Sequence, residues 1–238
     1  MRWLFAALFF ASPAAAVTCE DAEFDGDSYS ICTVDVANED LRLFHTDDTG
    51  DVLGGFGAVA SSLEAGELVF AMNAGMYHDD RAPVGHYVEN GVEKMRVVTN
   101  AGPGNFGLLP NGVFCVNDDQ AQVYETLAFV DATPTCRDAT QSGPMLVIDG
   151  ELHPRFLVDG KSRFVRNGVG TTADGKTAIF AISNDPVNFH TFGRLFKDYL
   201  GLPNALYFDG KVSRLHAPSL RRSDIGFRLG PIVGVTRK

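Results

Sequence analysis

The chain has 238 residues and a formal charge of −10 at pH 7, from 20 basic and 30 acidic side chains. Binding to a nucleic-acid backbone or to an anionic membrane surface needs clustered Lys and Arg, so the composition argues against both functions. The length is typical of one domain that is large enough to bury its own core.

The first sixteen residues have the pattern of a secretory signal peptide. Arg2 gives a positive start, residues 3–11 are apolar, and residues 14–16 form an Ala-Ala-Ala cleavage site. The apolar run is too short to span a bilayer, and a retained N-terminal anchor is the minor alternative. We therefore expect residues 1–16 to be removed and residues 17–238 to form a single domain. The protein would then be periplasmic or secreted, with no membrane insertion.

The four cysteines are an even number in a chain that we expect to be exported, which predicts two disulfides. Three pairings are possible. We favour Cys19–Cys32 and Cys115–Cys136, because each pair flanks one compact segment. No C-x-x-C spacing occurs and the His residues are scattered, so we expect no metal site and no cofactor.

Short alternating or apolar runs predict many strands. The first two, residues 29–36 and 41–45, are joined by Asn38-Glu39-Asp40 and are expected to form a hairpin. The remaining strands are expected over residues 67–72, 86–89, 92–98, 112–116, 122–130, 145–148, 165–171, 177–183, 205–208 and 232–236. Repeated Asn-Gly and Asp-Gly dipeptides suit hairpin turns, which favour a largely antiparallel sheet.

One helix is well specified between residues 184 and 201. Asn184-Asp185 can cap it, Pro186 suits its first turn, and Gly201 can stop it. A weaker helix is expected over residues 54–63. The sequence therefore predicts an α+β fold, in which a twisted, largely antiparallel sheet packs against a few helices.

Polar residues and glycines recur where the apolar strands begin or end. The most distinctive run is Gln141-Ser142-Gly143-Pro144, which leads into an apolar strand. Glycine lets a ligand or another backbone approach closely, and proline makes the entry rigid. The alternative for this run is a plain turn before a buried strand.

Eight such runs, in this order, resemble the phosphodiester glycosidase family, which includes bacterial envelope proteins and the lysosomal uncovering enzyme. They cover residues 73–77, 85–91, 104–114, 139–150, 166–170, 187–196, 204–210 and 230–235. The chain departs from the family pattern at His86, where an aliphatic residue is usual, and at Thr191, where an acidic residue is usual. The change at Thr191 argues against a catalytic role for that position.

The resemblance implies a hydrolase that cleaves a sugar from a glycosyl phosphodiester in an envelope or extracellular glycan. Cleavage of a glycosidic bond needs a carboxylate near the anomeric carbon. Asp209 ends an apolar strand, where burial can tune its pKa, and the family places this element at the pocket. Glu89 is the second candidate. The alternatives are a turn residue before Gly210 for Asp209 and a solvated hairpin residue for Glu89.

Arg166 is the candidate for binding the phosphate, because its planar fork matches phosphate oxygens and glycines follow it. A structural ion pair is the alternative. Other candidates for contacting the sugar or the phosphate are Asn73, Gln141, Ser142, Gly143 and Asn188. Asn73 also suits a turn, and Asn188 lies near the start of the expected helix, where free N–H groups attract phosphate.

Two functions of different classes follow from these observations. The first is a periplasmic or secreted glycosidase acting on a phosphate-linked sugar. The second is a non-catalytic periplasmic glycan-binding protein, which would keep the polar pocket without a tuned carboxylate. Both would take a carbohydrate or sugar-phosphate ligand and neither would bind nucleic acid.

Overall fold

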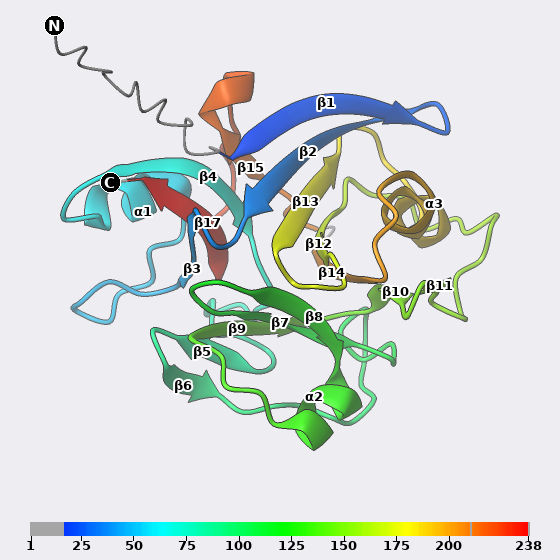
Figure 1. Cartoon of the computed structure of the whole chain (residues 1–238), viewed down its shortest axis with the longest axis horizontal. Coiled ribbons are helices and arrows are strands. Elements are labelled where there is room, and N and C mark those ends of the chain that lie inside the picture. Colours follow the sequence, from blue (N-terminus) through cyan, green and yellow to red (C-terminus); the bar gives the residue numbers. More distant parts are fainter. Residues whose placement is uncertain (1–16, 210, 238) are drawn as a thin grey trace, which may run out of the picture.

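Three antiparallel sheets form the body of the protein (Figure 1). The computed structural model describes residues 17–209 and 211–237. The expected signal peptide, residues 1–16, lies outside the described residues. Within them every pairing between strands of a sheet is antiparallel, which confirms the expected α+β class.

The first sheet has seven strands in the order β1-β2-β13-β12-β14-β10-β11. Their bounds are Thr18–Phe24, Asp27–Asp35, Thr177–Ser183, Asn167–Thr171, Asn204–Asp209, Met145–Ile148 and Glu151–Leu152. The second sheet has the order β16-β15-β4-β17-β3, with bounds Arg222–Ser223, Leu215–Ala217, Glu67–Asn73, Ile232–Arg237 and Asp40–Phe44. The third has the order β6-β5-β9-β7-β8, with bounds Val92–Met95, Tyr87–Glu89, Asp138–Ser142, Gly112–Val116 and Ala121–Glu125.

The expected hairpin between residues 29–36 and 41–45 is wrong, although both strands exist. β2 pairs with β1 and β13 in the first sheet, whereas β3 pairs with β17 in the second. The true hairpin is β1–β2, and it turns at Asp25-Gly26, where both residues have positive φ. Strand β2 therefore pairs with the strand before it and with β13, which is far along the chain. The local alternation of apolar and polar residues does not reveal these partners.

The helices are short and differ in part from expectation. α1 spans Phe56–Ser62, α2 spans Thr126–Ala132, and α3 spans Phe189–Arg194 and continues as a π-helix over Leu195–Tyr199. The expected strand over residues 122–130 is wrong beyond Glu125, whose carboxylate accepts bonds from Leu127 N and Ala128 N and so starts α2. Among the described residues, no helix combines the length and apolar character needed to cross a bilayer.

The start of α3 also differs, because its cap is Asn188 rather than Asn184-Asp185. The Asn188 side chain accepts a bond from Thr191 N at 2.8 Å. Asp185 instead accepts a bond from Ser28 N, and Asn184 donates to Ser28 Oγ, so both fasten the end of β13 to β2.

The three sheets meet in one core around Phe180 of β13. Its ring centroid lies 4.9 Å from that of Phe70 in β4 and 5.9 Å from that of Phe114 in β7. Each sheet thus contributes an aromatic side chain to the same fully buried cluster. A second cluster packs α3 and the π-helix against the other face of the first sheet, as Figure 1 shows on its right side.

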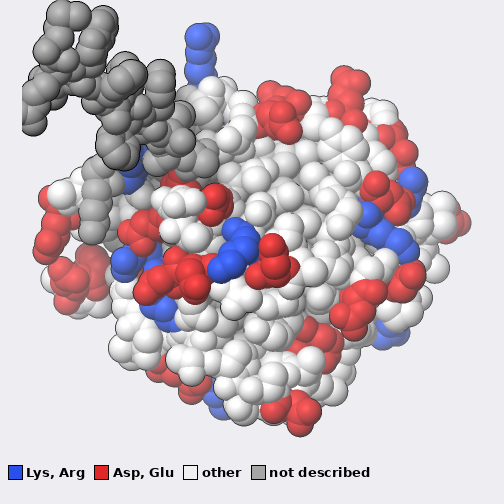
Figure 2. Space-filling model, viewed as in Figure 1, with Lys and Arg blue, Asp and Glu red and all other residues white. Residues whose placement is uncertain are grey.

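Acidic and basic side chains are interspersed on the face seen in Figure 2, and no continuous basic patch covers it. This face therefore carries the same mixture of acidic and basic side chains as the composition of the chain.

Both expected disulfides are present: Cys19–Cys32 joins β1 to β2, and Cys115–Cys136 joins β7 to the segment between α2 and β9. We expect four thiols to react with an alkylating agent only after reduction, which intact-mass analysis can check. Replacing Cys115 and Cys136 together with Ala should lower the free energy of unfolding by about 2–4 kcal/mol, because the bond closes a separation of 21 residues. Urea unfolding measures this loss. Free thiols in the native protein would contradict the prediction.

Candidate functional site

Two buried asparagines join the ends of β4 and β12. Asn73 Nδ2 donates to Asn167 Oδ1 at 3.2 Å, and Asn167 Nδ2 donates to the Asn73 carbonyl at 2.8 Å. Both residues are fully buried. Since a buried amide that lacks partners is destabilising, this reciprocal pair fixes the second sheet against the first at one point.

The same two amides hold the segment that follows β14. Asn167 Oδ1 also accepts bonds from Asp209 N at 3.2 Å and Ser213 Oγ at 3.1 Å. Asn73 Oδ1 accepts a bond from Arg214 N at 2.8 Å. The asparagine pair therefore fixes the backbone at Asp209, where β14 ends, and at Arg214, just before β15 begins. Asn73 is thus a residue that positions Arg214.

Asp209 lies close to two tyrosines, the half-buried Tyr77 and the buried Tyr207. Burial raises the pKa of the Tyr77 hydroxyl, and the negative charge of Asp209 raises it further, while Arg81 and Arg214 act in the opposite direction. Burial likewise raises the pKa of Tyr207; the Arg166 charge lowers it and the Asp209 charge raises it. Both hydroxyls therefore stay protonated near neutral pH and can donate hydrogen bonds.

Arg166 is fully buried and stacks on aromatic rings. Its guanidinium carbon lies 3.7 Å from the ring centroid of Phe189 and 5.3 Å from that of Tyr207. Nε donates to the Val187 carbonyl and Nη2 donates to the Ser162 carbonyl. Nη1 is buried and has no hydrogen bond of good geometry with a described residue. Burial lowers the pKa of Arg166, as expected for a cation away from water.

Arg214 resembles Arg166 in its surroundings. Its guanidinium carbon lies 5.5 Å from the ring centroid of Phe56, and Nε and Nη2 are buried without a hydrogen-bond partner among the described residues. Burial lowers its pKa, although Tyr77 and Asp224 act in the opposite direction. The Tyr77 hydroxyl is buried and unpartnered in the same way. We call Tyr77, Arg166, Tyr207, Asp209 and Arg214 the tyrosine–arginine cluster.

Three of the expected binding residues, Gln141, Ser142 and Gly143, contact neighbouring segments of the protein itself. Gln141 accepts bonds from His86 N and Val98 N and donates to the Val98 carbonyl. Ser142 Oγ donates to the Phe208 carbonyl. A side chain at Gly143 would come within 2.6 Å of Asn111 Cβ, so the glycine admits a neighbouring segment of the protein itself. All three link β9 to adjacent segments.

Asn188 is also occupied. Besides capping α3, its Nδ2 donates to the Val158 carbonyl at 3.0 Å and to the Gly160 carbonyl at 3.3 Å. The α3 helix then begins with Phe189, which stacks on Arg166. Asn188 therefore helps to position Phe189 and the backbone of residues 158–160 near Arg166.

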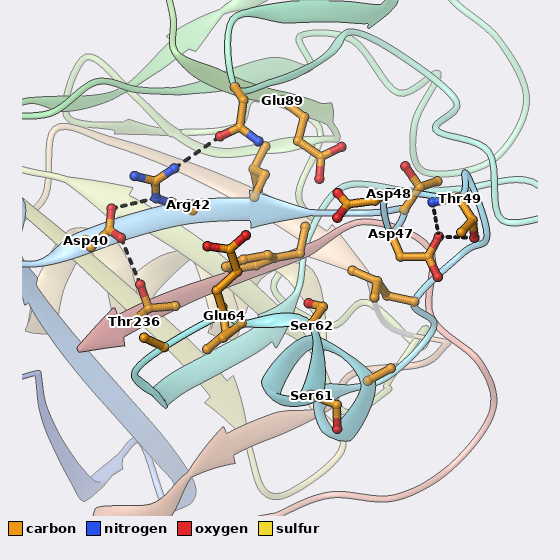
Figure 3. A pocket seen from close by; sticks show the side chains of 18 residues that line it. Asp40, Arg42, Asp47, Asp48, Thr49, Ser61, Ser62, Glu64, Glu89 and Thr236 are labelled. Atoms are coloured by element: carbon orange, nitrogen blue, oxygen red, sulfur yellow. Dashed lines mark hydrogen bonds and ion pairs between the residues drawn. The ribbon is translucent and has the colours of Figure 1, made fainter. Parts of the chain in front are cut away.

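Glu89 lies apart from Asp209. Its carboxylate accepts a bond from His45 N and forms a short ion pair with Lys94. It lines a cavity of about 1090 Å³ with Asp40, Arg42 and other residues of β3 and α1 (Figure 3).

The strand β9 separates the two carboxylates. Val88, next to Glu89, pairs with Ala139, whereas Ser142 at the other end of β9 bonds to Phe208, next to Asp209. These two contacts are three to four residues apart along β9, which corresponds to a distance of about 10–13 Å along the strand. Paired glycosidase carboxylates lie within roughly 9.5 Å, so this geometry does not bring Glu89 and Asp209 together.

Four residues of the candidate site are not predicted from the sequence: Tyr77, Asn167, Tyr207 and Arg214. Tyr77, Asn167 and Tyr207 fall inside runs that carry the family resemblance, and that was their only signal. Arg214 lies outside every such run, and only the fold brings it near Tyr77.

Comparisons with known proteins agree with the fold and the order of these segments. The family model for phosphodiester glycosidase matches residues 66–216, a range that contains the whole tyrosine–arginine cluster. The YigE protein of Escherichia coli strain K12, which is itself uncharacterised, is 32% identical over 207 residues, covering 86% of this chain and 81% of YigE.

Solved structures share the fold at low sequence identity. The catalytic domain of zebrafish N-acetylglucosamine-1-phosphodiester alpha-N-acetylglucosaminidase, auto-inhibited by its pro-peptide, has a TM-score of 0.59 at 14% identity. The match covers 95% of this chain and 85% of that domain. A hypothetical protein from Synechocystis has a TM-score of 0.62 at 13% identity, over 93% of this chain and 62% of that one. A putative exported protein from Burkholderia pseudomallei has a TM-score of 0.53 at 12% identity, with 94% and 75% covered.

The family model covers more than half of the chain, and YigE is similar over most of its length. The chain therefore belongs to the phosphodiester glycosidase family.

Proposed function

We propose that this protein is an exported hydrolase that removes a sugar from a glycosyl phosphodiester. The observation that carries the proposal is the pair of buried arginines, Arg166 and Arg214, which form no ion pair among the described residues. Nη1 of Arg166 is buried and has no hydrogen bond of good geometry with a described residue, and Nε and Nη2 of Arg214 are buried without a partner among the described residues. A buried cation without a counter-charge is destabilising, and a phosphate group satisfies both its charge and its N–H groups.

The reaction breaks the bond between the anomeric carbon and a phosphate oxygen. Water supplies a hydroxyl group to the sugar, and the phosphate leaves as a phosphomonoester. A phosphomonoester is already a good leaving group, so the demand for a general acid is small. Arg166 and Arg214 would hold its charge, the Tyr77 hydroxyl would donate to an oxygen of the substrate, and Asp209 would supply the carboxylate near the anomeric carbon.

Export is supported by three observations. The chain begins with the pattern of a signal peptide, it contains two disulfides, and a protein of the same fold is described as exported. The name of the zebrafish enzyme supplies a first substrate to test, a methyl phosphodiester of α-linked N-acetylglucosamine. Release of the reducing sugar measures turnover.

The carboxylate can be tested with Asp209→Asn. This change keeps the size of the side chain and its ability to form a turn but removes the charge. We expect turnover to fall by about a hundredfold or more while binding of the sugar phosphate, measured by calorimetry, persists. Asp149→Asn is the matched control, because Asp149-Gly150 is also an Asp-Gly dipeptide that follows an apolar strand. Equal rates for Asp209→Asn and the wild type would refute the catalytic role. Binding without turnover by the wild type would favour a glycan-binding protein.

The phosphate contact can be tested with Arg166→Lys, which keeps the charge and loses the planar fork. We expect kcat/KM to fall about 30-fold, which corresponds to about 2 kcal/mol of transition-state stabilisation. Methyl phosphate should raise the Tm of the wild type and raise that of the variant less.

Arg137→Lys is the control for the loss of a forked arginine, because Arg137 pairs with Asp118 and Asp138 away from the cluster. Thermal unfolding without ligand shows whether Arg166→Lys is folded. A folded Arg166→Lys protein with the activity of the wild type would exclude Arg166 from the site.

A further inference from the structure

Exposed hydrophobic side chains are concentrated on two segments that contact the buried arginines. Nine large hydrophobic side chains are exposed among the described residues, and five of them lie on these segments. They are Leu157, Val158 and Phe164 on one segment and Ile225 and Phe227 on the other, with exposed fractions of 67%, 74%, 51%, 95% and 79%. Single exposed hydrophobic residues are ordinary, whereas groups of them mark binding surfaces.

The first segment, residues 153–165, contacts Arg166 directly. Its Ser162 carbonyl accepts a bond from Arg166 Nη2, and the Phe164 ring centroid lies 5.6 Å from the Arg166 guanidinium carbon. Asn188 holds its middle through the Val158 and Gly160 carbonyls. In Figure 1 it is the yellow-green loop that leaves β11 and runs beside α3. Its exposed hydrophobic residues are therefore anchored next to Arg166.

This segment also differs in charge from the rest of the chain. It contains Arg155, Lys161 and Arg163 but only one acidic residue, Asp159, and all four are exposed. The whole chain has a formal charge of −10. Exposed cations alternating with exposed hydrophobic side chains suit a ligand that is both anionic and apolar.

The second segment, residues 224–228, lies next to the other arginine. A side chain at Gly226 would come within 3.5 Å of Arg214 Cδ. The segment is held at both ends, because Asp224 bonds to the backbone of Leu215 and Arg228 donates to the Val52 carbonyl. Ile225 and Phe227 project from this short, anchored segment and have almost no cover.

We propose that the group on the far side of the substrate phosphate is an apolar chain, so that the substrate is an amphiphilic sugar phosphodiester. This inference rests on the proposed function, which places the phosphate at Arg166 and Arg214. A phosphodiester has two ester arms, and the sugar occupies the one at Asp209. The other arm leaves the arginines toward the two segments, whose hydrophobic side chains bury its methylene groups.

Binding of simple alkyl phosphates tests the inference without a sugar or a reaction. Octyl phosphate, kept below the concentration at which it forms micelles, is compared with methyl phosphate by calorimetry. The wild type should bind octyl phosphate at least tenfold more tightly. The variant Leu157→Ser/Val158→Ser/Ile225→Ser/Phe227→Ser should lose most of this preference. Leu127→Ser/Val130→Ser is the matched control, because both residues are exposed hydrophobics of α2, away from the two segments, and the preference should persist there.

Several results would overturn the inference. These are equal binding of the two phosphates by the wild type, binding of neither, or a preference that the four-site variant retains. Binding of the wild type and the four-site variant to phosphatidylglycerol vesicles is measured as a further comparison. Vesicle binding that depends on the four residues, without a preference for octyl phosphate, would mean that the segments dock on a membrane and would also overturn the inference.

Hydrolysis separates this inference from the proposed function. The methyl and octyl diesters of N-acetylglucosamine 1-phosphate are compared as substrates, and kcat/KM should be at least tenfold higher for the octyl diester. If neither diester is cleaved but the preference for octyl phosphate holds, the catalytic proposal fails for this sugar and the apolar site stands. If both are cleaved at equal rates, the function stands and the apolar site fails.

Discussion

The reciprocal hydrogen bonds between Asn73 and Asn167 determine the arrangement of the candidate site. One amide ends β4 and the other begins β12, so the pair joins two sheets whose strands are far apart in the sequence. The amide oxygens that remain hold the backbone of Asp209 and Arg214. Because each buried amide atom would be destabilising without its partner, the two residues specify one arrangement of the sheets. An aspartate at either position could not donate these bonds.

This link works only because the sheets already meet in a common core. Phe180 contacts an aromatic ring from each of the other two sheets, and such contacts leave little freedom for one sheet to slide on another. The core holds the sheets together by burying apolar surface, and the asparagines fix one point of their alignment. Sequence patterns of period two identify the strands, but they do not identify which sheet a strand joins. For this reason the sequence predicts both strands, over residues 29–36 and 41–45, but not the strands with which they pair.

The candidate site was predictable only in part, for physical reasons. Asn73, Arg166 and Asp209 stand where apolar strands begin or end, so position along the chain made them candidates. Gln141 and Ser142 stand in similar positions, yet their side chains bond to other segments of the protein. A polar residue at a strand end gives the same local signal in both cases. Tyr77 and Arg214 gave no signal of their own, because only tertiary packing places them together.

The electrostatics of the cluster are the physical basis for proposing that it binds an anion. Burial lowers the pKa of both arginines, which means that the charged forms are less stable there than in water. Burial and Asp209 raise the pKa of both tyrosines, so these side chains stay neutral and do not balance the arginines. Asp224 is the carboxylate that raises the pKa of Arg214, and the aromatic faces around Arg166 compensate for only part of its desolvation. A fold selected for stability alone gains from replacing such arginines with apolar residues. Their presence therefore supports the proposal that the cluster binds a phosphate, whose charge would stabilise both guanidinium groups. The segment attached to Arg166 carries exposed hydrophobic and basic side chains, which supports the further proposal that this phosphate bears an apolar group.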